Sequence, residues 1–305
     1  MAREATLRSP ILWFGGKGNM VKKLLKLIPK HQTYVEVFGG GAQLLFAKPP
    51  SPVEVYNDVD SGLINFFRVL RNPEKFQQFH RLVSLTPYSR EEYNFCRDSW
   101  EQCEDDVERA YRWFVVARMS FSGHFGHSWS FSLNASSHGM SAACSSWLSA
   151  IEMLPQIHAR IMRVQIEHKD FRELLPLYDT PETLFYMDPP YIPETRKHGR
   201  YKCEMTIDDH RELVDIVLKV KGMVMLSGYR HSIYEPLERS SWIRHDYKTA
   251  CHAVAKTRAT GILGKGSAKK MQSRVESVWL SPNCQKQPSL INILHCQRRD
   301  ENGRP

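Results

Sequence analysis

The chain has 305 residues, of which 42% are hydrophobic and 11% aromatic, enough to bury a core in one large domain or in one domain with an insertion. Its 42 lysines and arginines exceed its 33 acids by nine, and from Ser240 onward there are twelve basic residues against four acidic ones. This balance favours a polyanionic partner. The N-terminus lacks the apolar segment of a signal peptide and no apolar run approaches 18 residues, so we expect a protein that neither enters nor crosses a membrane.

The cysteines and histidines argue for a reduced, metal-free protein. The seven cysteines are scattered, and no pair has the spacing of a zinc site, which favours a cytoplasmic chain over a disulfide-bonded one. The closest histidines, His124 and His127 in GHFGH, have no cysteine or carboxylate beside them in the sequence. Because this pattern lacks the usual ligand sets, we expect no metal.

Short apolar runs alternate with helical patterns in two separate regions of the chain. The predicted strands are 34–38, 53–57, 163–168, 184–188, 223–229, 278–280 and 290–294. The predicted helices between them are 19–28, 41–47, 61–70 and 207–219, the last preceded by Thr206 as a plausible N-cap. Apolar strands separated by helices are typical of an α/β fold with a buried, mostly parallel sheet and helices on both faces.

The middle of the chain has a different pattern. Helices are predicted at 73–83, 89–102, 104–118 and 144–160, with a Gly/Ser/aromatic stretch at 120–139. This pattern indicates a helical insertion into the α/β domain. The predicted division is a first α/β part at 1–66, an insertion at 67–160 with a hairpin or loop at 118–139, a second α/β part at 161–283, and a C-terminal strand and tail at 284–305.

Two glycine-containing stretches could bring the backbone close to a ligand. In VEVFGGGA (35–42) a strand runs into three glycines and then a helix, and VEVYND (53–58) ends in Asp58 about twenty residues after the first glycine. Dinucleotide-binding folds place a ribose-binding carboxylate at this spacing. The glycines are not spaced as GxGxxG, so a ligand with a ribose and no phosphate fits equally well. In WFGGK (13–17), which is not a phosphate loop, Lys17 offers a charge to a ligand carboxylate.

The stretch FYMDPPY (185–191) ends a predicted strand in an acid, two prolines and a tyrosine. Side chains at such strand ends face the ligand crevice of α/β sheets. Asp188 supplies a carboxylate acceptor, and Pro189 supplies a carbonyl without an N–H. Tyr191 adds a flat aromatic face. The combination predicts a receptor for a planar ring that bears an amino group.

These motifs, in the order WFGGK, VEVFGGGA, NDVD and DPPY with a helical insertion before DPPY, resemble those of the Dam-type adenine-N6 DNA methyltransferases. The resemblance covers about residues 10–70 and 160–230 well. It implies a Rossmann-like methyltransferase fold and transfer of a methyl group from S-adenosylmethionine to N6 of a flipped-out adenine, with S-adenosylhomocysteine as product and no metal. It also implies double-stranded DNA as partner, a monomer or weak dimer, and a cytoplasmic, nucleoid-associated location.

The resemblance also assigns site residues. The pair Asp170–Phe171 in HKDFREL matches the positions that hold the cofactor's adenine, by carboxylate acceptance and aromatic stacking. The residues implied to bind the cofactor are Trp13, Phe14, Gly15, Lys17, Glu36, Phe38, Gly39, Gly41, Asp58, Asp170, Phe171 and Asp188. The implied catalytic residues are Asp188, Pro189, Pro190 and Tyr191.

Three regions are candidates for DNA contact. The stretch ARMSFSGHFG (117–126) resembles the start of the family's recognition hairpin, whereas TRKHGRYK (195–202) and the basic segment 256–274 could bind phosphates. The candidate residues are Arg118, Ser120, Ser122, His124, Arg196, Lys197, Arg200, Lys202, Lys256, Arg258, Lys265, Lys269 and Lys270. GATC-reading members typically carry asparagine where Ser122 stands, and asparagine reads adenine edges bidentately. Ser122 therefore argues against GATC and leaves another site, or relaxed specificity of a phage or prophage type, open.

Two alternatives remain. A cytosine-N4 DNA methyltransferase or an RNA methyltransferase could share the fold, although Asp188 rather than serine at the first DPPY position favours adenine. A non-catalytic nucleic-acid-binding module is the alternative from another class. The intact DPPY and glycine motifs argue against it.

Overall fold

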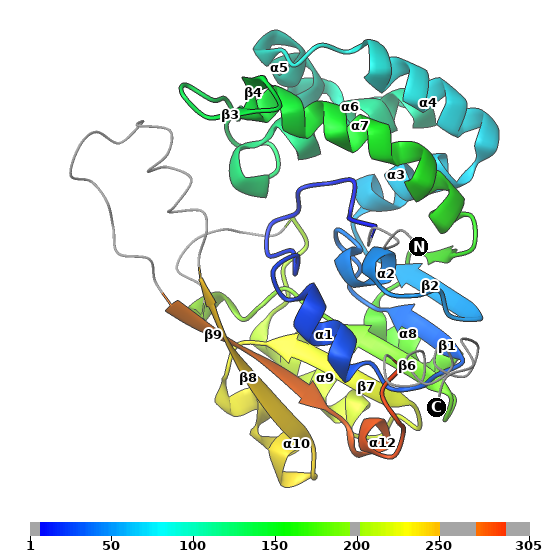
Figure 1. Ribbon diagram of the computed structural model, residues 1–305. Helices are drawn as coiled ribbons and strands as arrows, with labels where there is room; N and C mark the ends of the chain where they lie inside the picture. The colour runs from blue at the N-terminus through cyan, green and yellow to red at the C-terminus, as the bar shows by residue number, and fades with distance from the viewer. Residues whose placement is uncertain (1–6, 196–201, 251–272, 291–305) are drawn as a thin grey trace, which may run out of the picture. The chain divides into compact units, whose positions relative to one another are not determined.

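The computed structural model of the chain describes residues 7–195, 202–250 and 273–290 (Figure 1). The chain divides into two compact units. The helical unit comprises Met1–Gly16, Asp60–Arg163 and Lys248–Arg274, and the α/β unit comprises Lys17–Val59, Val164–Tyr247 and Val275–Pro305. The chain therefore leaves the α/β unit before Asp60 and re-enters it at Val164, a few residues from the predicted limits of the insertion.

The α/β unit is built on a seven-stranded sheet with the strand order β5-β2-β1-β6-β7-β9-β8 (Figure 1). The strands are β1 (Thr33–Glu36), β2 (Val53–Asn57), β5 (Gln165–Glu167), β6 (Thr183–Met187), β7 (Met223–Gly228), β8 (Ile243–Ala250) and β9 (Ser273–Leu280). The pairs from β5 to β7 are all parallel, and β9 pairs with β7 in the antiparallel direction. The predicted α/β class with a mostly parallel sheet is confirmed.

Helices cover both faces of this sheet. They are α1 (Val21–Leu27), α2 (Gln43–Ala47), α8 (Phe171–Tyr178), α9 (Ile207–Val217), α10 (Glu235–Arg239) and α12 (Pro282–Gln285), with 3-10 turns at Pro193–Thr195 and Ser232–Tyr234. On one face, alternate side chains of β1, β6 and β7 join leucines and valines of α8 and α9 in the hydrophobic core. On the other face, Glu36 of β1 accepts a hydrogen bond from the backbone of Leu45 in α2 at 2.9 Å. Alternation along β1 thus sends Val35 to one layer and Tyr34 and Glu36 to the other.

Several of the described elements differ from the sequence-based expectation, and the short helices α10 and α12 were not predicted. Strand β8 was not predicted because IRHDYKTA is largely polar, which suits a strand at the sheet edge. Strand β9 extends well before the predicted 278–280, through the polar residues of SRVES. Helix α8 was missed because it is short and contains Pro176. The predicted strand 290–294 falls almost entirely outside the described residues.

The helical unit packs five helices around aromatic side chains. They are α3 (Ser61–Arg71), α4 (Pro73–Leu85), α5 (Arg90–Ser99), α6 (Asp106–Met119) and α7 (Ala142–Ile161), all within the described part of the chain. Phe66 of α3 stacks on Phe114 of α6 with ring centroids 5.4 Å apart. A side chain at Gly62 would lie 2.4 Å from Trp113, so glycine permits the close α3–α6 approach. Helix α3 therefore packs with the insertion, although the sequence assigned its first turns to the α/β domain.

The stretch after α6 forms a loop rather than a long hairpin. A 3-10 turn at Phe121–Gly123 is followed by an isolated bridge between Ser120 and Trp129. The two-residue strands β3 (Ser136–Ser137) and β4 (Met140–Ser141) then pair just before α7.

A buried ion pair that the sequence did not reveal fixes α2 to β2. Lys48 Nζ lies 2.5 Å from Glu54 Oε1, with the two side chains 0% and 1% exposed. Lys48 also donates to Ser51 Oγ at 2.7 Å and lies over the Tyr34 ring at 4.4 Å. Two charges this deeply buried are tolerated only because each neutralises the other.

We expect Lys48→Met to lower the free energy of unfolding by about 3–5 kcal/mol, because it leaves Glu54 buried without a counter-charge. The double variant Lys48→Met/Glu54→Leu removes both charges and should recover much of that loss. Urea unfolding followed by circular dichroism measures both. If the double variant loses as much unfolding free energy as Lys48→Met and Glu54→Leu lose in total, the pair is not coupled as described.

Candidate functional site

The sheet topology brings two of the predicted motifs to one place. In the sheet, β1 lies between β2, which follows it in the chain, and β6, which comes much later in the chain. In open α/β sheets, ligands bind at the carboxyl ends of the strands where the strand order reverses in this way. Glu36 and Tyr186 are register partners, and Val37 N donates to Tyr186 O at 3.0 Å. The glycine stretch after β1 and DPPY after β6 therefore leave the sheet side by side.

The glycine turn is tightly held by residues at the end of β2. Gly40 N donates to Asp58 Oδ2 at 2.8 Å, and the Tyr56 hydroxyl donates to Gly40 O at 2.8 Å. A side chain at Gly39 would lie 2.2 Å from the Tyr56 ring, so this position requires glycine. Gly40 itself has a φ of 45°, in the left-handed region. The structure thus joins the predicted glycines to the predicted acid Asp58.

Asn57, which the sequence analysis did not single out, ties three segments together. Its side-chain amide donates to Val37 O at 2.8 Å and to Lys169 O at 3.0 Å, and its Oδ1 accepts from Lys169 N at 2.9 Å. Because Lys169 directly precedes Asp170, this side chain links the glycine turn to the predicted adenine-binding pair. The available signal in the sequence was a polar residue at the end of the apolar predicted strand 53–57.

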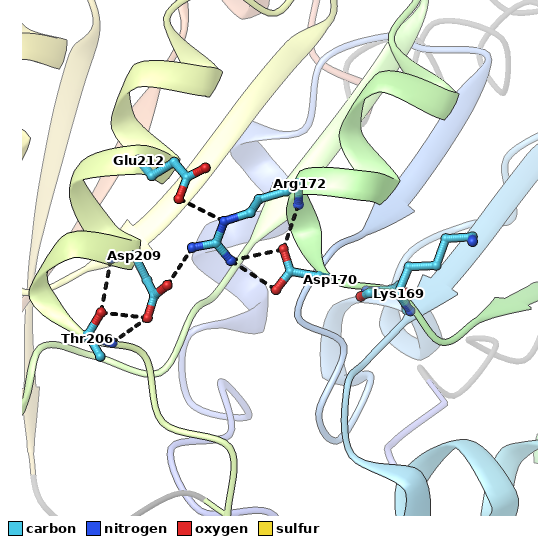
Figure 2. A network of polar contacts seen from close by, with 7 residues as sticks. Lys169, Asp170, Arg172, Thr206, Asp209 and Glu212 are labelled. Carbon is cyan, nitrogen blue, oxygen red and sulfur yellow. Dashed lines mark hydrogen bonds and ion pairs between the residues drawn. The ribbon is translucent and has the colours of Figure 1, made fainter.

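Asp170 and Phe171 begin α8 beside this link. Asp170 is the N-cap of the helix and accepts from Arg172 N at 2.9 Å and from Arg172 Nη1 at 3.0 Å (Figure 2). The Phe171 ring lies 5.9 Å from that of Phe38, which brings together two predicted cofactor residues. Phe171 is buried in the core, and the Arg172 guanidinium lies 4.4 Å from its ring centre. The ring therefore offers little free face, and Asp170 is the more accessible partner for a ligand.

The DPPY segment holds an ion pair with the N-terminal motif. Lys17 Nζ lies 2.8 Å from Asp188 Oδ1, with the side chains 6% and 19% exposed. The same ammonium lies 4.5 Å from the ring centre of Tyr191. Tyr191 also meets Tyr229, which follows β7, with the rings edge to face at 4.6 Å. Lys17, expected to bind a cofactor, thus contacts the residues expected to bind the reacting base.

Glu36 has a structural function in the site. Its Oε1 accepts from the Tyr34 hydroxyl and from Leu45 N, both at 2.9 Å, which anchors the start of α2 behind the glycine turn. Burial raises the pKa of Glu36 to about 8 despite these hydrogen bonds. Its Oε2 is buried and has no hydrogen-bond partner among the described residues.

The aromatic residues of the N-terminal motif belong to the helical unit, together with Gly15. Trp13 lies 6.0 Å from Trp113 and 6.5 Å from Phe125, and Phe14 lies 4.6 Å from the ring of His124. Both aromatic side chains therefore contact the loop that was predicted to recognise DNA. Lys17, four residues after Trp13, belongs to the α/β unit.

At the end of α6 and the start of that loop, two of the predicted DNA contacts are engaged by the protein itself. Arg118 donates to Ser146 O at 2.6 Å and to Ser146 Oγ at 2.8 Å, and burial lowers its pKa to about 10. Ser120 is fully buried and accepts from Gly126 N at 3.0 Å, a position suited to holding the loop rather than to meeting DNA. Ser122, with a φ of 56°, and His124 remain partly exposed.

Of the predicted phosphate contacts, Lys202 is described and exposed. The others lie outside the described residues: Arg196, Lys197, Arg200, Lys256, Arg258, Lys265, Lys269 and Lys270. Over the described ranges, no three His, Cys, Asp or Glu side chains gather as a metal site would require. No helix in those ranges is long and apolar enough to span a bilayer.

Comparison with known proteins extends this description. The chain is 29% identical over 124 residues to the DNA N-6-adenine-methyltransferase of Escherichia phage P1, covering 38% of this chain and 16% of that protein. It is 25% identical over 118 residues to the DNA adenine methylase of Salmonella typhi, covering 38% and 42% respectively. The alignments span less than half the length of either relative. A solved structure from Pyrococcus horikoshii, described as a candidate RNA methyltransferase, aligns over 87% of this chain and 83% of its own at 10% identity, with a TM-score of 0.34 that is too low to establish a common fold.

A family match covers most of the chain. Residues 13–259 fit the D12 class N6 adenine-specific DNA methyltransferases, from WFGGK through DPPY and beyond. This match confirms the resemblance seen in the motifs and agrees with a Rossmann-like methyltransferase fold. The chain therefore belongs to the D12 class N6 adenine-specific DNA methyltransferase family.

Proposed function

We propose that this chain transfers a methyl group from S-adenosylmethionine to N6 of adenine in double-stranded DNA. The observation that carries the proposal is the placement of DPPY beside the glycine turn, at the carboxyl ends of the paired strands β6 and β1. A base-binding motif and a ribose-binding motif there lie next to each other at the ligand-binding edge of the sheet. Family membership supports the same reaction.

The residues around the glycine turn suit S-adenosylmethionine better than a phosphorylated nucleotide. The turn amide of Gly40 already donates to the carboxylate of Asp58, and a second carboxylate, Asp170, lies beyond Asn57. Because the Gly40 amide is occupied, it is not offered to a pyrophosphate. The two carboxylates can accept hydrogen bonds from ribose hydroxyls and from an adenine amino group. When bound, S-adenosylmethionine supplies a methyl group made electrophilic by its sulfonium.

DPPY prepares the amino group that receives the methyl. The N6 lone pair of adenine is delocalised into the ring, which makes it a poor nucleophile. Hydrogen bonds from its two protons to the Asp188 carboxylate and the Pro189 carbonyl favour sp³ geometry and free the lone pair. The acceleration comes from positioning and electrostatic preorganisation. N6 is hidden in the duplex, so the base flips out, and Tyr191 offers replacement stacking.

Lys17 positions Asp188 in this scheme. Its ammonium forms an ion pair with Asp188 Oδ1 at 2.8 Å and lies over the ring of Tyr191. A single buried group therefore restrains both side chains. The remaining acceptor capacity of the carboxylate serves the amino group. We therefore assign Lys17 to the base-binding part of the site rather than to the cofactor carboxylate.

The proposal extends to the setting of the reaction. S-adenosylhomocysteine leaves as product, and no metal takes part because proton loss from the methylated, positively charged nitrogen is facile. Duplex DNA in the cytoplasmic nucleoid is the substrate, and a monomer or weak dimer carries out the reaction. The basic segments at 195–202 and 256–274 are the parts of the chain that we propose contact phosphates.

We expect Asp188→Asn to lower methyl transfer by about 10²- to 10³-fold or more, because the amide is a weaker acceptor for the amino group. Affinity for S-adenosylhomocysteine should change little. The measurements are radiolabelled methyl incorporation into DNA, digestion to nucleosides, and calorimetric titration with the product. The exposed Asp208→Asn serves as the matched control.

Two results would contradict the proposal. Near-wild-type rates in Asp188→Asn would remove this carboxylate from the mechanism. Recovery of N4-methylcytosine in place of N6-methyladenine, or preference for RNA, would replace the adenine reaction with the corresponding alternative. A wild-type chain that binds nucleic acid without transferring any methyl group would indicate a non-catalytic module.

We expect Lys17→Met to lower kcat by about 10- to 100-fold, because Asp188 and Tyr191 lose their common restraint. Affinity for S-adenosylhomocysteine should stay within about twofold of wild type. Steady-state kinetics and product titration separate the two effects, with the exposed Lys22→Met in α1 as control. A variant that binds the product poorly at unchanged kcat would return Lys17 to the cofactor carboxylate.

A further inference from the structure

Arg172, in the first turn of α8, contacts three carboxylates from two helices (Figure 2). Its Nη1 lies 3.0 Å from each oxygen of Asp170, at the start of its own helix. Its Nη2 donates to Asp209 Oδ1 and its Nε donates to Glu212 Oε2 at 2.7 Å, both on α9. Each nitrogen of the guanidinium therefore has an acidic partner. Arginine suits this arrangement because its planar fork of donors is rigid.

Two further contacts hold the guanidinium in place. It lies over the Phe171 ring, 4.4 Å from the centroid, so an aromatic face supports the plane of the fork. Asp209 is itself fixed, because its Oδ2 accepts from Thr206 N and Thr206 Oγ1, both at 2.7 Å, in the capping box that starts α9. The Thr206 hydroxyl, with help from Arg172, lowers the pKa of Asp209 to about 2 despite partial burial, so this partner stays charged at neutral pH.

The arrangement has a consequence for Asp170. Its side chain is 42% exposed, so part of the carboxylate is open to a ligand. The rest of it accepts hydrogen bonds from the backbone N and from the Nη1 of Arg172. A carboxylate offers about four lone-pair sites, and Arg172 occupies some of them on both oxygens. The direction of the remaining sites is then set by a side chain that is anchored on a second helix. Without the Arg172 side chain, the Asp170 carboxylate would keep the N-cap hydrogen bond from the backbone of residue 172 to Oδ1 but would lose the contacts that fix both oxygens.

We propose that Arg172 is a positioning residue that aims the Asp170 carboxylate at the amino group of the cofactor's adenine and so makes the site selective for adenine over hypoxanthine. The inference rests on the proposed function, in which Asp170 accepts from that amino group. Hypoxanthine carries a carbonyl oxygen at this position, which faces a fixed carboxylate unfavourably. A site built to pair with an amino group rejects an analogue that lacks it, provided its own polar group cannot turn away.

A purely structural function for the same contacts predicts a different result. If Arg172 only joins α8 to α9, its loss lowers stability and weakens all ligands of the site alike. If it aims Asp170, its loss chiefly weakens the ligand with the amino group. The ratio of two affinities therefore separates these functions, whereas a melting temperature or a single affinity does not.

The experiment compares S-adenosylhomocysteine with S-inosylhomocysteine, its 6-oxo counterpart, by calorimetric titration of the full chain. We expect wild type to prefer the adenine ligand and Arg172→Gln to lower the affinity ratio about tenfold, mainly through weaker binding of S-adenosylhomocysteine. Arg172→Lys keeps the charge but not the fork, and should fall between the two. Arg211→Gln removes an exposed pair with Asp208 on the same helix α9 and should leave the ratio unchanged.

If Arg172→Gln does not fold, Glu212→Gln gives the answer, since it loosens the guanidinium at its more exposed end and should lower the ratio about threefold. The double variant Asp170→Asn/Arg172→Gln should show the ratio of Asp170→Asn alone, because Arg172 acts through that carboxylate. A ratio within twofold of wild type in Arg172→Gln or in Glu212→Gln overturns the inference.

Failure of the underlying function gives a separate outcome. A wild-type chain that binds neither ligand refutes the proposed methyltransferase function and this inference with it. A wild-type chain that binds both ligands equally well refutes the adenine contact of Asp170, and therefore the positioning function of Arg172, while the methyltransferase proposal stands.

Discussion

The candidate site is arranged around the parallel pairing of strands β1 and β6. Thr33 lies opposite Thr183 at the start of this pairing, and Glu36 lies opposite Tyr186 at its end. This register determines that the two strands end at the same level of the sheet. A shift of one residue would also turn every side chain of one strand to the opposite face of the sheet. The turn at Gly39–Gly41 and the DPPY segment would then no longer emerge as neighbours. Asn57 adds β2 and the start of α8 to the same edge by three hydrogen bonds. Backbone pairing thus does most of the assembly, and few side chains complete it.

The α/β unit matches acids with bases supplied by other segments of the chain. Lys17 meets Asp188, Lys48 meets Glu54, and Arg172 meets acids on both α8 and α9. Glu36, by contrast, is buried with no ion pair among the described residues, and burial raises its pKa. The pairings restrict side-chain rotation at the places where the proposed chemistry needs fixed acceptors. Preorganisation of this kind is what a reaction without a strong base depends on.

Much of the site could be predicted from the sequence because its signals are local. DPPY, the three glycines and Asp58 each follow a recognisable strand, and the end of a parallel strand fixes where they lie. The partners of these residues were not predictable. Lys17 and Asp188 are 171 positions apart (188 − 17), and Asn57 and Lys169 are 112 apart, so only the folded chain reveals that they touch. The same holds for Arg172, whose partners on α9 are defined by helix packing.

The fold was predictable to a similar extent. Apolar strands and the capping threonine of α9 gave clear patterns, and both are present. The polar edge strand β8 and the proline-containing α8 did not. Strand β8 is largely polar, and α8, although Phe171, Leu174 and Leu175 are spaced as on one helix face, has only eight residues and contains Pro176. The loop after α6 shows a different limit. Its resemblance to a recognition hairpin suggested DNA contacts at its start, whereas Ser120 is buried and Arg118, at the end of α6, binds Ser146.

The contact between Gly39 and Tyr56 restricts how this sequence can diverge. A methyl group at Gly39 collides with the Tyr56 ring, and the same tyrosine holds the turn through its hydroxyl. A change at the glycine is therefore tolerated only in a background where the ring has already become smaller, and such a background has lost the hydroxyl bond to Gly40. Each single step is deleterious before the second can help. The two positions should therefore be strongly epistatic, so that relatives either keep both residues or differ at both.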